Sequence, residues 1–565
     1  MKKNLLIALS SLTSVLIGTL STSCSSNPPH NEEDYCDPTL FDCDEEDKKE
    51  EEEKVELKKY DLTNYEYDNN VSNKDGSMSY EIFVRSFADS DGDGIGDFDG
   101  VTSKLDYLKN LGIKTIWLMP IMPSPTYHGY DVLDYYSVNP EYGSMDDFLN
   151  LVKVASEKNI DVMIDIVFNH SSVKHPWFIQ SYEDYTSGYD KEDSFADWYC
   201  WSDKAAGYNH SYNGSKVFYE GRFDPSMPDF NTKNEAVRNE FVKILDFWIE
   251  KGVKGFRFDA VKYFDYENAS YNAEFLTYLK ENISDQSVYF VGECFDNINK
   301  INDYYKSKCD SFFKFNASMN GYGNDTIIGQ AKINIKSNLF GDLIESQEKI
   351  LKENNPNGYS SYFISNHDLD RASKSLSGEH AKSAASLLSL LPGTPFMYYG
   401  EEIELKGQRN TSPDDQSDVL RRLPMIWSKE NKDDECDFPE SNRQDLNHYE
   451  QVELGAFDQE KVGFSLLNHY KKVINVRNKY PFIKNSVFKN LTSKIETKNE
   501  NILAYELTYN DERIVVIHNF SYFNSTIDLK GVASEIVDVI SQLNYIPELD
   551  GSSLKIGQKT TLVLK

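Results

Sequence analysis

The amino-acid sequence predicts an α/β protein whose main domain is a (β/α)8 TIM barrel, with an inserted subdomain after the third strand and a C-terminal antiparallel β domain. Three observations predict this fold class. From about Ser77 onward, short β-branched or aromatic runs alternate with helical patterns, as in repeated β-α units with a parallel sheet. There are eight such runs, the number that closes a barrel. After about Phe482 the pattern changes to alternating strands.

Each of the eight expected strands is a short apolar segment. They comprise residues 80–87, 115–120, 161–168, 255–261, 288–293, 310–315, 360–365 and 395–399. The segment before the fourth strand shows the helical period of an outer-ring helix. Its apolar face consists of Val237, Phe241, Ile244, Leu245, Trp248 and Ile249.

The segment between the third and fourth strands is too long for one helix and is rich in Trp and Tyr. We therefore expect residues 171–231 to form an inserted subdomain. Residues 75–170 and 232–482 are then the two parts of the barrel.

The C-terminal part has a different pattern from the barrel. Segments 502–509 and 514–520 alternate in the manner of antiparallel strands, and no helix of barrel type follows them. We expect residues 483–565 to form a C-terminal β-sandwich domain.

Residues 1–24 have the pattern of a signal peptide for export. Two Lys residues precede a mostly apolar run at 5–20, and small residues lead to Cys24. The end of this segment is similar to the lipobox of bacterial lipoproteins, although Ser21 stands where an aliphatic residue is usual. We expect an exported protein, either held by a lipid anchor on the extracellular face of the cell membrane or secreted.

Residues 25–74 have the composition of a disordered tether. Between residues 31 and 57 there are 14 acidic and 3 basic residues, so we expect this segment to stay extended and solvated. A tether after an anchored Cys would hold a folded domain away from the membrane surface. Cys36 and Cys43 within it are able to pair, and no metal-ligand spacing links the Cys residues that follow.

The charge balance excludes one class of partner. Acidic residues outnumber basic ones 92 to 59, and the formal net charge is -33. Binding to nucleic acid requires clustered Lys and Arg to neutralise phosphates. We therefore expect no nucleic-acid partner, whereas a neutral polymer such as a polysaccharide is compatible with this charge.

Reactive polar residues follow four of the expected strands. They lie at 165–170 (DIVFNH), 257–259 (RFD), 292–293 (GE) and 366–368 (NHD). In a barrel these positions meet at the carboxyl ends of the strands, where active sites are built. Arg257 and Asp259 are two residues apart on one strand and therefore point to the same side. A guanidinium beside a carboxylate favours the ionised Asp.

Glu293 follows the next strand, so two carboxyls converge on one site. A glycosidase uses two carboxyl groups: one attacks the anomeric carbon, and the other protonates the leaving oxygen. A single Asp or His at a strand end is more often a helix cap or a loop hydrogen bond. Four strands that all end in this way are harder to explain by capping, and we interpret them as an active site.

Four segments resemble the signature regions of the α-amylase family of glycoside hydrolases: DIVFNH at 165–170, GFRFDAVK at 255–262, VGE at 291–293 and FISNHD at 363–368. Further similarity is found at 129–131 (GYD), 227–231 (MPDFN), 393–395 (GTP) and 399–402 (YGEE). The resemblance covers about residues 78–480. The MPDFN segment resembles exported bacterial α-amylases of the subgroup intermediate between oligo-1,6-glucosidases and neopullulanases.

The resemblance implies roles for three carboxyls. Asp259 would be the nucleophile, Glu293 the general acid/base, and Asp368 the carboxylate that grips sugar hydroxyls in the transition state. The implied substrate-binding residues are Tyr130, Asp131, His170, Arg257, Lys262 and His367. The reaction would be a double displacement with retention of the anomeric configuration, and either water or another sugar would serve as acceptor.

Residues 89–97 (DSDGDGIGD) place carboxylates at alternate positions around glycines, which suits a hard cation with many oxygen ligands. The alternative is an Asp- and Gly-rich turn without a metal. A full EF-hand is excluded because Gly100 stands where a bidentate Glu is needed. The loop is similar to the calcium loop of several α-amylase subgroups. This implies a structural Ca²⁺ with the ligands Asp89, Asp91, Asp93, the carbonyl of Ile95, and Asp97.

The resemblance favours one bond type. Ala260 follows the nucleophile position, whereas members that prefer α-1,6 bonds commonly carry Val there. Lys262 is similar to the Lys of a Lys-His pair on the leaving-group side, but Tyr263 replaces the His. We expect an α-amylase that cleaves α-1,4 bonds in starch, glycogen or maltodextrins.

Two kinds of alternative stay open. The nearer kind is an oligo-1,6-glucosidase, an α-glucosidase or a cyclomaltodextrinase or neopullulanase-type enzyme of the same family. The other is a catalytically inactive glucan-binding surface protein. Asp259 and Glu293 are both present, which argues against that reading, although a fold does not guarantee chemistry.

Overall fold

The computed structural model describes residues 76–189, 191–205, 207, 209–296, 298–318, 325–409, 418–438, 452–542 and 545–565. The predicted signal peptide, lipid anchor and tether lie outside the described residues. Within the described part of the chain, no helix combines the length and apolar character that a membrane crossing requires. Cys200, Cys294, Cys309 and Cys436 are free thiols.

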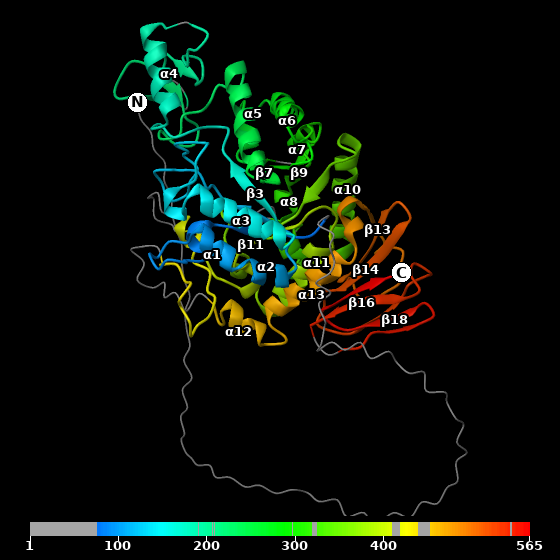
Figure 1. Cartoon of the computed structure of the whole chain (residues 1–565). Coiled ribbons are helices and arrows are strands. Elements are labelled where there is room, and N and C mark those ends of the chain that lie inside the picture. The colour runs from blue at the N-terminus through cyan, green and yellow to red at the C-terminus, as the bar shows by residue number, and fades with distance from the viewer. Residues whose placement is uncertain are drawn as a thin grey trace, which may run out of the picture. The chain divides into compact units, whose positions relative to one another are not determined.

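Eight short, mostly buried strands form one parallel sheet that curves into a barrel (Figure 1), in the order β10-β9-β8-β7-β3-β2-β1-β11. The strands are β1 (Ser79–Ile82), β2 (Thr115–Leu118), β3 (Asp161–Ile166), β7 (Gly255–Phe258), β8 (Tyr289–Gly292), β9 (Ser311–Phe313), β10 (Tyr359–Ser361) and β11 (Phe396–Tyr398). The backbone N–H of Thr394 donates to the carbonyl of Ser360 at 2.8 Å and joins the two edges. The predicted barrel is therefore confirmed.

All eight observed strands are shorter than the expected segments, because the chain leaves the sheet before the expected segment ends. In the first segment the strand ends at Ile82, and a 3-10 helix η1 (Val84–Ser86) follows. In the third segment the strand ends at Ile166, before the buried polar residues Asn169 and His170. The residues that follow the strands are thus free to adopt the irregular backbone of a binding site.

Helices surround the barrel. They are α1 (Phe98–Ser103), α2 (Leu105–Leu111), α3 (Met145–Glu157), α5 (Glu235–Glu250), α6 (Ala269–Asn282), α7 (Ile298–Tyr304), α8 (Phe315–Ser318), α9 (Ile327–Ala331), α10 (Ser337–Asn354), α11 (Gly378–Leu390), α12 (Ala456–Glu460) and α13 (Leu466–Asn478). Helix α5 begins after Asn234, whose side chain accepts a hydrogen bond from the N–H of Ala236. Its expected apolar face is buried except for the half-buried Ile249, and Phe241 stacks on Phe168 at 3.9 Å between ring centroids.

The segment between β3 and β7 contains helix α4 (Pro176–Ser187) and a small sheet in the order β4-β6-β5. The strands are β4 (Trp201–Ser202), β5 (Asn209–Ser211) and β6 (Phe218–Glu220). Aromatic rings form its interior, with Phe178 5.1 Å from Trp201 and 5.0 Å from Tyr219 between ring centroids. The N–H of Phe230 donates to the carbonyl of Asn169 at 2.9 Å, so the insert returns to the strand end from which it leaves.

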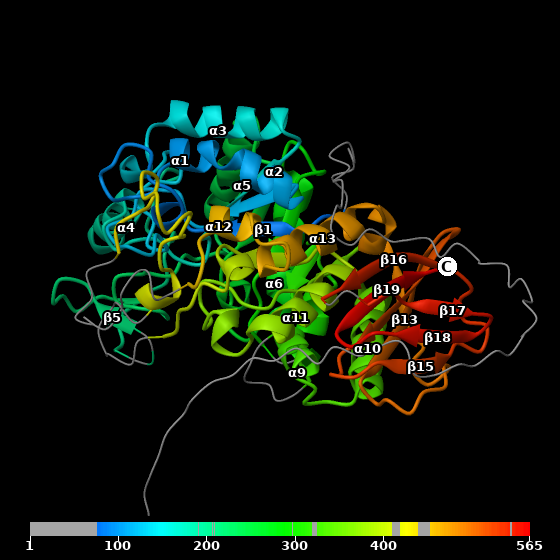
Figure 2. The same cartoon turned by 90° about the horizontal axis from the view of Figure 1, so that it is seen from below.

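The C-terminal strands form two antiparallel sheets, in the orders β12-β13-β14-β19-β16 and β15-β18-β17. The strands are β12 (Val487–Asn490), β13 (Ile502–Tyr509), β14 (Glu512–Asn519), β15 (Ser525–Asp528), β16 (Ile536–Ser541), β17 (Glu548–Asp550), β18 (Ser553–Ile556) and β19 (Thr560–Leu564). Both sheets contribute to one apolar core, for example through Val515 and Leu554. Figure 2 shows these strands, in red, on the opposite side of the barrel from α4.

Candidate active site

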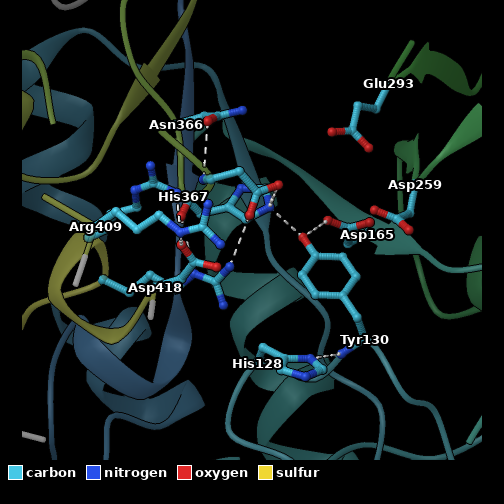
Figure 3. Close-up of polar contacts among 12 residues, drawn as sticks. His128, Tyr130, Asp165, Asp259, Glu293, Asn366, His367, Arg409 and Asp418 are labelled. Atoms are coloured by element: carbon cyan, nitrogen blue, oxygen red, sulfur yellow. Dashed lines mark hydrogen bonds and ion pairs between the residues drawn. The ribbon is translucent and has the colours of Figure 1, made fainter. Parts of the chain in front are cut away.

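Strands β3, β7 and β8 place the buried guanidinium of Arg257 among three carboxyls, those of Asp165, Asp259 and Glu293. Figure 3 labels the three carboxyl side chains. Arg257 is paired in register with Asp165 of the neighbouring strand. Its Nη1 lies 2.9 Å from Asp165 Oδ1 and 2.7 Å from Asp259 Oδ1, and its Nη2 lies 3.0 Å from Glu293 Oε2. A buried guanidinium requires such partners. Arg257 therefore holds the carboxyls of Asp259 and Glu293 in one place.

The backbone after β7 also fixes Glu293. Ala260 has a φ of 50°, in the left-handed region that few residues with a side chain adopt. In this conformation the N–H of Ala260 donates to Glu293 Oε2 at 3.0 Å. The N–H of Val261 donates to the Glu293 carbonyl, also at 3.0 Å. The turn that follows Asp259 thus positions the second carboxyl directly.

Protonation of this pair is set mainly by burial. Burial raises the pKa of Asp259, and the Arg257 guanidinium opposes that rise. Burial also raises the pKa of Glu293, and the charges of Asp259 and Asp368 raise it further against the effect of Arg257. The ion pair expected from the sequence is present. Burial outweighs the effect of this ion pair on the pKa of Asp259, and the sequence pattern does not show how fully the carboxyl is desolvated.

His367 and Asp368 follow β10 on the other side of the site. The Nδ1 of His367 lies 2.5 Å from Glu81 Oε1, and its Nε2 lies 3.1 Å from Asp368 Oδ2. Burial opposes a charge on His367, but Asp368 and Glu81 outweigh it and raise the pKa to about 10. Burial likewise disfavours the charged Asp368, but His367 and Arg422 outweigh it and hold the pKa well below its usual range. The pair is therefore an imidazolium beside a carboxylate.

Tyr130 connects the two sides of the site. Its hydroxyl lies 2.7 Å from His367 Nε2 and donates to Asp165 Oδ2 at 3.2 Å. Its ring stacks on the imidazole of His367 with 5.7 Å between ring centroids and an angle of 17°. Figure 3 shows Tyr130 between Asp165 and His367. The expected residue is thus part of the cluster, and its ring orientation is fixed by two hydrogen bonds.

Asp131 and His170 are buried beside this cluster. Asp131 Oδ1 accepts a hydrogen bond from Ser124 Oγ at 2.6 Å. Among the described residues, Asp131 Oδ2 and His170 Nε2 have no hydrogen-bond partner. Burial lowers the pKa of His170 to about 4, so its ring is neutral near pH 7. Because unpaired buried polar atoms are unfavourable, these two atoms fit a ligand that carries hydroxyl groups.

Lys262 lies apart from the carboxyl cluster. It belongs to the 3-10 helix η3 (Val261–Tyr263), and its Nζ lies 3.1 Å from Asp296 Oδ2. This ion pair joins the loop after β7 to the loop after β8. Of the expected site residues, Lys262 is the one that the structure places at the edge, on the side of Glu293.

The Asp- and Gly-rich loop follows η1 and is tied together by its own backbone. Asp89 Oδ2 accepts from the N–H of Gly94 at 2.8 Å, and Asp97 caps helix α1. Carboxylate oxygens of Asp89, Asp91 and Asp97 lie within 4.8 Å of one another. Asp93 is outside this group, and its Oδ1 accepts from the N–H of Ile95 at 2.7 Å. Three of the four expected carboxylates therefore form an acidic cluster whose oxygen atoms suit a hard cation.

Two residues of the cluster were not predicted. Glu81 is an acidic residue inside an apolar strand segment, and this is a signal that the sequence offers. Its partner His367 is 286 residues away, so the pair itself is not visible in the sequence. Arg422 lies 3.0 Å from Asp368 through Nη2 and Oδ1. It follows a short 3-10 helix and belongs to no recognisable motif.

Comparison with known proteins identifies the family. A model of the α-amylase catalytic domain matches residues 81–486. The chain belongs to the α-amylase family. Alpha-amylase 3 of Dictyoglomus thermophilum is 38% identical over 499 residues, which cover 86% of this chain and 93% of that protein. An oligo-1,6-glucosidase of Bacillus cereus is 29% identical, with coverage of 79% of this chain and 90% of that protein.

Solved structures of the family agree with this assignment. Amy13B of Eubacterium rectale has a TM-score of 0.80 and 33% identity, with 87% of this chain and 96% of that chain covered. The α-amylase of H. orenii has a TM-score of 0.72 and 32% identity, with 87% and 99% covered. The chain is therefore a glycoside hydrolase of the α-amylase family. Its similarity to α-amylases and to oligo-1,6-glucosidases agrees with the expected subgroup.

Proposed function

We propose that the protein is a retaining α-amylase that cleaves α-1,4-glucosidic bonds in starch, glycogen or maltodextrins. The observation that carries this proposal is the bridge from Arg257 to both Asp259 and Glu293, which brings two carboxyls together at the barrel mouth. A nucleophile and an acid at one site are what double displacement requires. The similarity to an α-amylase at 38% identity supports the choice of α-1,4 bonds.

In the first step Glu293 gives its proton to the glycosidic oxygen while Asp259 attacks the anomeric carbon. The bond between that carbon and the oxygen breaks, and the leaving sugar departs as an alcohol. The raised pKa of Glu293 favours the protonated form that this step needs. Asp259 reacts in the ionised form that Arg257 favours. The product is a covalent glycosyl-enzyme with inverted configuration.

In the second step the ionised Glu293 takes a proton from water, and the oxygen attacks the anomeric carbon from the side that the leaving sugar vacated. The bond to Asp259 breaks, and the configuration is inverted again, which gives net retention. A second sugar in place of water gives transglycosylation. Asp368 stays ionised throughout because its pKa is lowered, and it grips hydroxyls of the ring under attack.

We further propose that Ca²⁺ binds the loop at residues 89–97 and has a structural role. The three clustered carboxylates Asp89, Asp91 and Asp97 support this proposal. Such a cation would neutralise the cluster and tie the loop after β1 to helix α1. The pattern that names Asp93 and the carbonyl of Ile95 as further ligands stays a prediction.

We also propose that the enzyme is exported, on the basis of the signal-like residues 1–24. Cell fractionation with surface proteolysis of intact cells tests this, because an exported enzyme is accessible to the protease. Incorporation of a radiolabelled fatty acid, lost in Cys24→Ser, would distinguish a lipid anchor from secretion.

The product pattern of the purified enzyme on soluble starch tests the proposed activity. Mixed maltooligosaccharides whose new reducing ends have the α configuration are expected. Glucose as the sole product would instead identify an α-glucosidase, and cleavage of isomaltose without cleavage of starch would identify an oligo-1,6-glucosidase. Binding of starch without cleavage of any α-glucan would identify an inactive glucan-binding protein.

A further inference from the structure

The turn YGEE at residues 399–402 has no part in the proposed mechanism, although its sequence belongs to the resemblance. It follows β11 and leads into the 3-10 helix η5 (Glu401–Ile403). Glu401 and Glu402 are adjacent carboxyl groups, and both are buried. Burial of a carboxyl is unfavourable unless hydrogen bonds replace the lost water. The hydrogen-bond partners of these two groups therefore indicate what the turn does.

Glu401 joins the end of β10 to helix α13. Its Oε2 accepts a hydrogen bond from Ser365 Oγ at 2.8 Å, and its Oε1 accepts one from the hydroxyl of Tyr470 at 2.7 Å. Ser365 is buried and lies two residues before His367 and three before Asp368. Tyr470 belongs to α13, one of the helices that surround the barrel. The carboxyl of Glu401 thus has one partner beside the active site and one partner away from it.

Tyr399 contacts two further segments of the same side of the site. Its N–H donates to the carbonyl of Glu81 at 3.0 Å, and its hydroxyl donates to the carbonyl of Leu423 at 2.7 Å. Glu81 is the partner of His367, and Leu423 follows Arg422, which pairs with Asp368. The turn therefore contacts every segment that supplies a charge to this half of the cluster.

Glu402 adds a contact to strand β1. Its Oε1 accepts hydrogen bonds from the hydroxyls of Tyr80 at 2.6 Å and Tyr107 at 2.7 Å. Tyr80 directly precedes Glu81, and successive side chains of a strand point to opposite sides. The contact with Glu402 thus fixes the outer side of β1, while Glu81 faces the interior. Within the turn, Glu401 is the side chain that reaches the loop of the catalytic carboxylate.

We propose that Glu401 is a positioning residue for His367 and Asp368, and that it acts through Ser365. The inference rests on the proposed function, because it takes Asp368 as the carboxylate that grips hydroxyls of the ring under attack. Such a group has to be held within about 0.5 Å of its productive position, and supporting hydrogen bonds provide this precision. Glu401 touches no reacting atom in the proposed reaction, so its effect depends on the contact with Ser365.

Two hydroxyl deletions separate positioning from stability. Ser365→Ala and Tyr470→Phe each remove one hydrogen bond of the same carboxyl, so both should lower the Tm. Ser365→Ala should lower kcat/KM for maltoheptaose about tenfold, whereas Tyr470→Phe should keep it within about twofold of the wild type. Thermal unfolding and steady-state kinetics of the two variants measure this contrast.

Two substitutions of Glu401 itself test the same contact. Glu401→Leu removes both hydrogen bonds and should lower kcat/KM at least as much as Ser365→Ala does. Glu401→Gln keeps an oxygen that accepts from Tyr470 and gains an amide N–H that donates to Ser365 Oγ. This conservative variant should restore most of the activity that Glu401→Leu loses.

The choice of substrate locates the effect. Maltoheptaose carries glucosyl units on the leaving-group side, whereas α-maltosyl fluoride carries only fluoride there. Asp368 grips the ring under attack, which both substrates contain. Ser365→Ala should therefore show the same fold loss of kcat/KM on both. A loss on maltoheptaose alone would place the effect on the leaving group and would overturn the inference.

The outcomes distinguish the two proposals. If the wild-type enzyme does not cleave maltoheptaose, the proposed function is wrong and the inference falls with it. If the wild type cleaves maltoheptaose but Ser365→Ala and Glu401→Leu keep its kcat/KM, only the positioning role is overturned. Equal losses of kcat/KM in Ser365→Ala and Tyr470→Phe would also overturn it, because the loss would then follow from lower stability and not from the contact with the loop.

Discussion

Two clusters of carboxyl groups in the described part of the chain, at the strand ends and in the loop at residues 89–97, have different partners. At the strand ends several carboxyls face a cationic side chain of the same chain, as Asp259 and Glu293 face Arg257. In the loop at residues 89–97, the carboxylates of Asp89 and Asp97 accept hydrogen bonds from backbone N–H groups. Among the described residues, neither carboxylate forms an ion pair with a Lys, Arg or His. Cations built into the fold can tune reactivity, whereas a cluster without them is suited to a bound metal ion.

The strand-end cluster itself divides into two parts. Asp259 and Glu293 share one guanidinium, and their side chains are 12% and 15% exposed. Asp368 faces two cations, His367 and Arg422, and its side chain is 44% exposed. The pKa is therefore raised for the first two carboxyls and lowered for the third. The number of cations that face each carboxyl separates the two groups that react or exchange protons from the one that stays charged.

The largest effect is expected when Asp259 and Glu293 are changed one at a time. Asp259→Asn and Glu293→Gln should each lower kcat for maltoheptaose by about 10⁴-fold or more, because each removes a group that the reaction requires. On α-maltosyl fluoride, whose leaving group needs no proton, Glu293→Gln should lose much less activity than Asp259→Asn. Rate measurements on both substrates check this.

Equal losses for the two variants on α-maltosyl fluoride would contradict the assignment of nucleophile and acid. Circular dichroism and thermal unfolding of both variants serve as the control for folding. The substitutions are isosteric, so a variant that unfolds early would indicate loss of the Arg257 bridge rather than loss of chemistry.

A smaller effect is expected for Asp368→Asn. Because Asp368 contributes charge and hydrogen bonds but no covalent step, kcat/KM should fall about 10²- to 10³-fold. Steady-state kinetics on maltoheptaose measure this fall, with Asp303→Asn on the protein surface as the matched control. A loss as large as that of Asp259→Asn on both substrates would show that Asp368 takes part in the covalent step.

Much of this arrangement could be predicted from the sequence, because local spacing encodes it. The two-residue separation of Arg257 and Asp259 places both on one face of a strand, and the four polar strand ends share one rim of the barrel. What could not be predicted depends on contacts between distant segments. Glu81 meets His367 only because β1 and the end of β10 face the same interior.

The depth of burial and the arrangement of the carboxylates in the loop at residues 89–97 also could not be predicted from the sequence. The pattern at residues 89–97 names four carboxylates; Asp89, Asp91 and Asp97 lie close together, and Asp93 accepts a hydrogen bond from the N–H of Ile95. Whether Asp93 also binds the metal stays a prediction. For Asp259 the neighbouring Arg257 could be predicted, whereas the desolvation that raises the pKa depends on the closed barrel around it.

The variant Glu81→Gln tests whether His367 is protonated in the folded protein. His367 has a pKa of about 10 in the folded protein, above its unfolded value, so its protonation stabilises the fold fully below about pH 6.5 and this contribution is lost as the pH rises through 10. Removal of the Glu81 charge should lower the free energy of unfolding by about 2 kcal/mol near pH 6. Urea unfolding of wild type and variant at pH 6, 8 and 10 measures the difference, which should shrink with pH. A difference that is the same at all three values would contradict a protonated His367.

The smallest effect is expected at the loop that lacks built-in cations. Ca²⁺ at about 10 times its Kd should add about 1.4 kcal/mol to the free energy of unfolding, and a chelator should reverse this. Asp89→Asn should abolish the calcium-dependent rise in Tm, because Asp89 belongs to the group of three carboxylates. Asp93→Asn, outside that group, should keep most of the rise and is the matched control. Thermal unfolding of both variants with calcium and with chelator measures this contrast. An equal loss of the calcium-dependent rise in Tm in both variants would mean that the metal also binds Asp93, as the sequence pattern predicts. If the Tm of the wild type does not respond to calcium, the loop is an Asp- and Gly-rich turn held by its backbone alone.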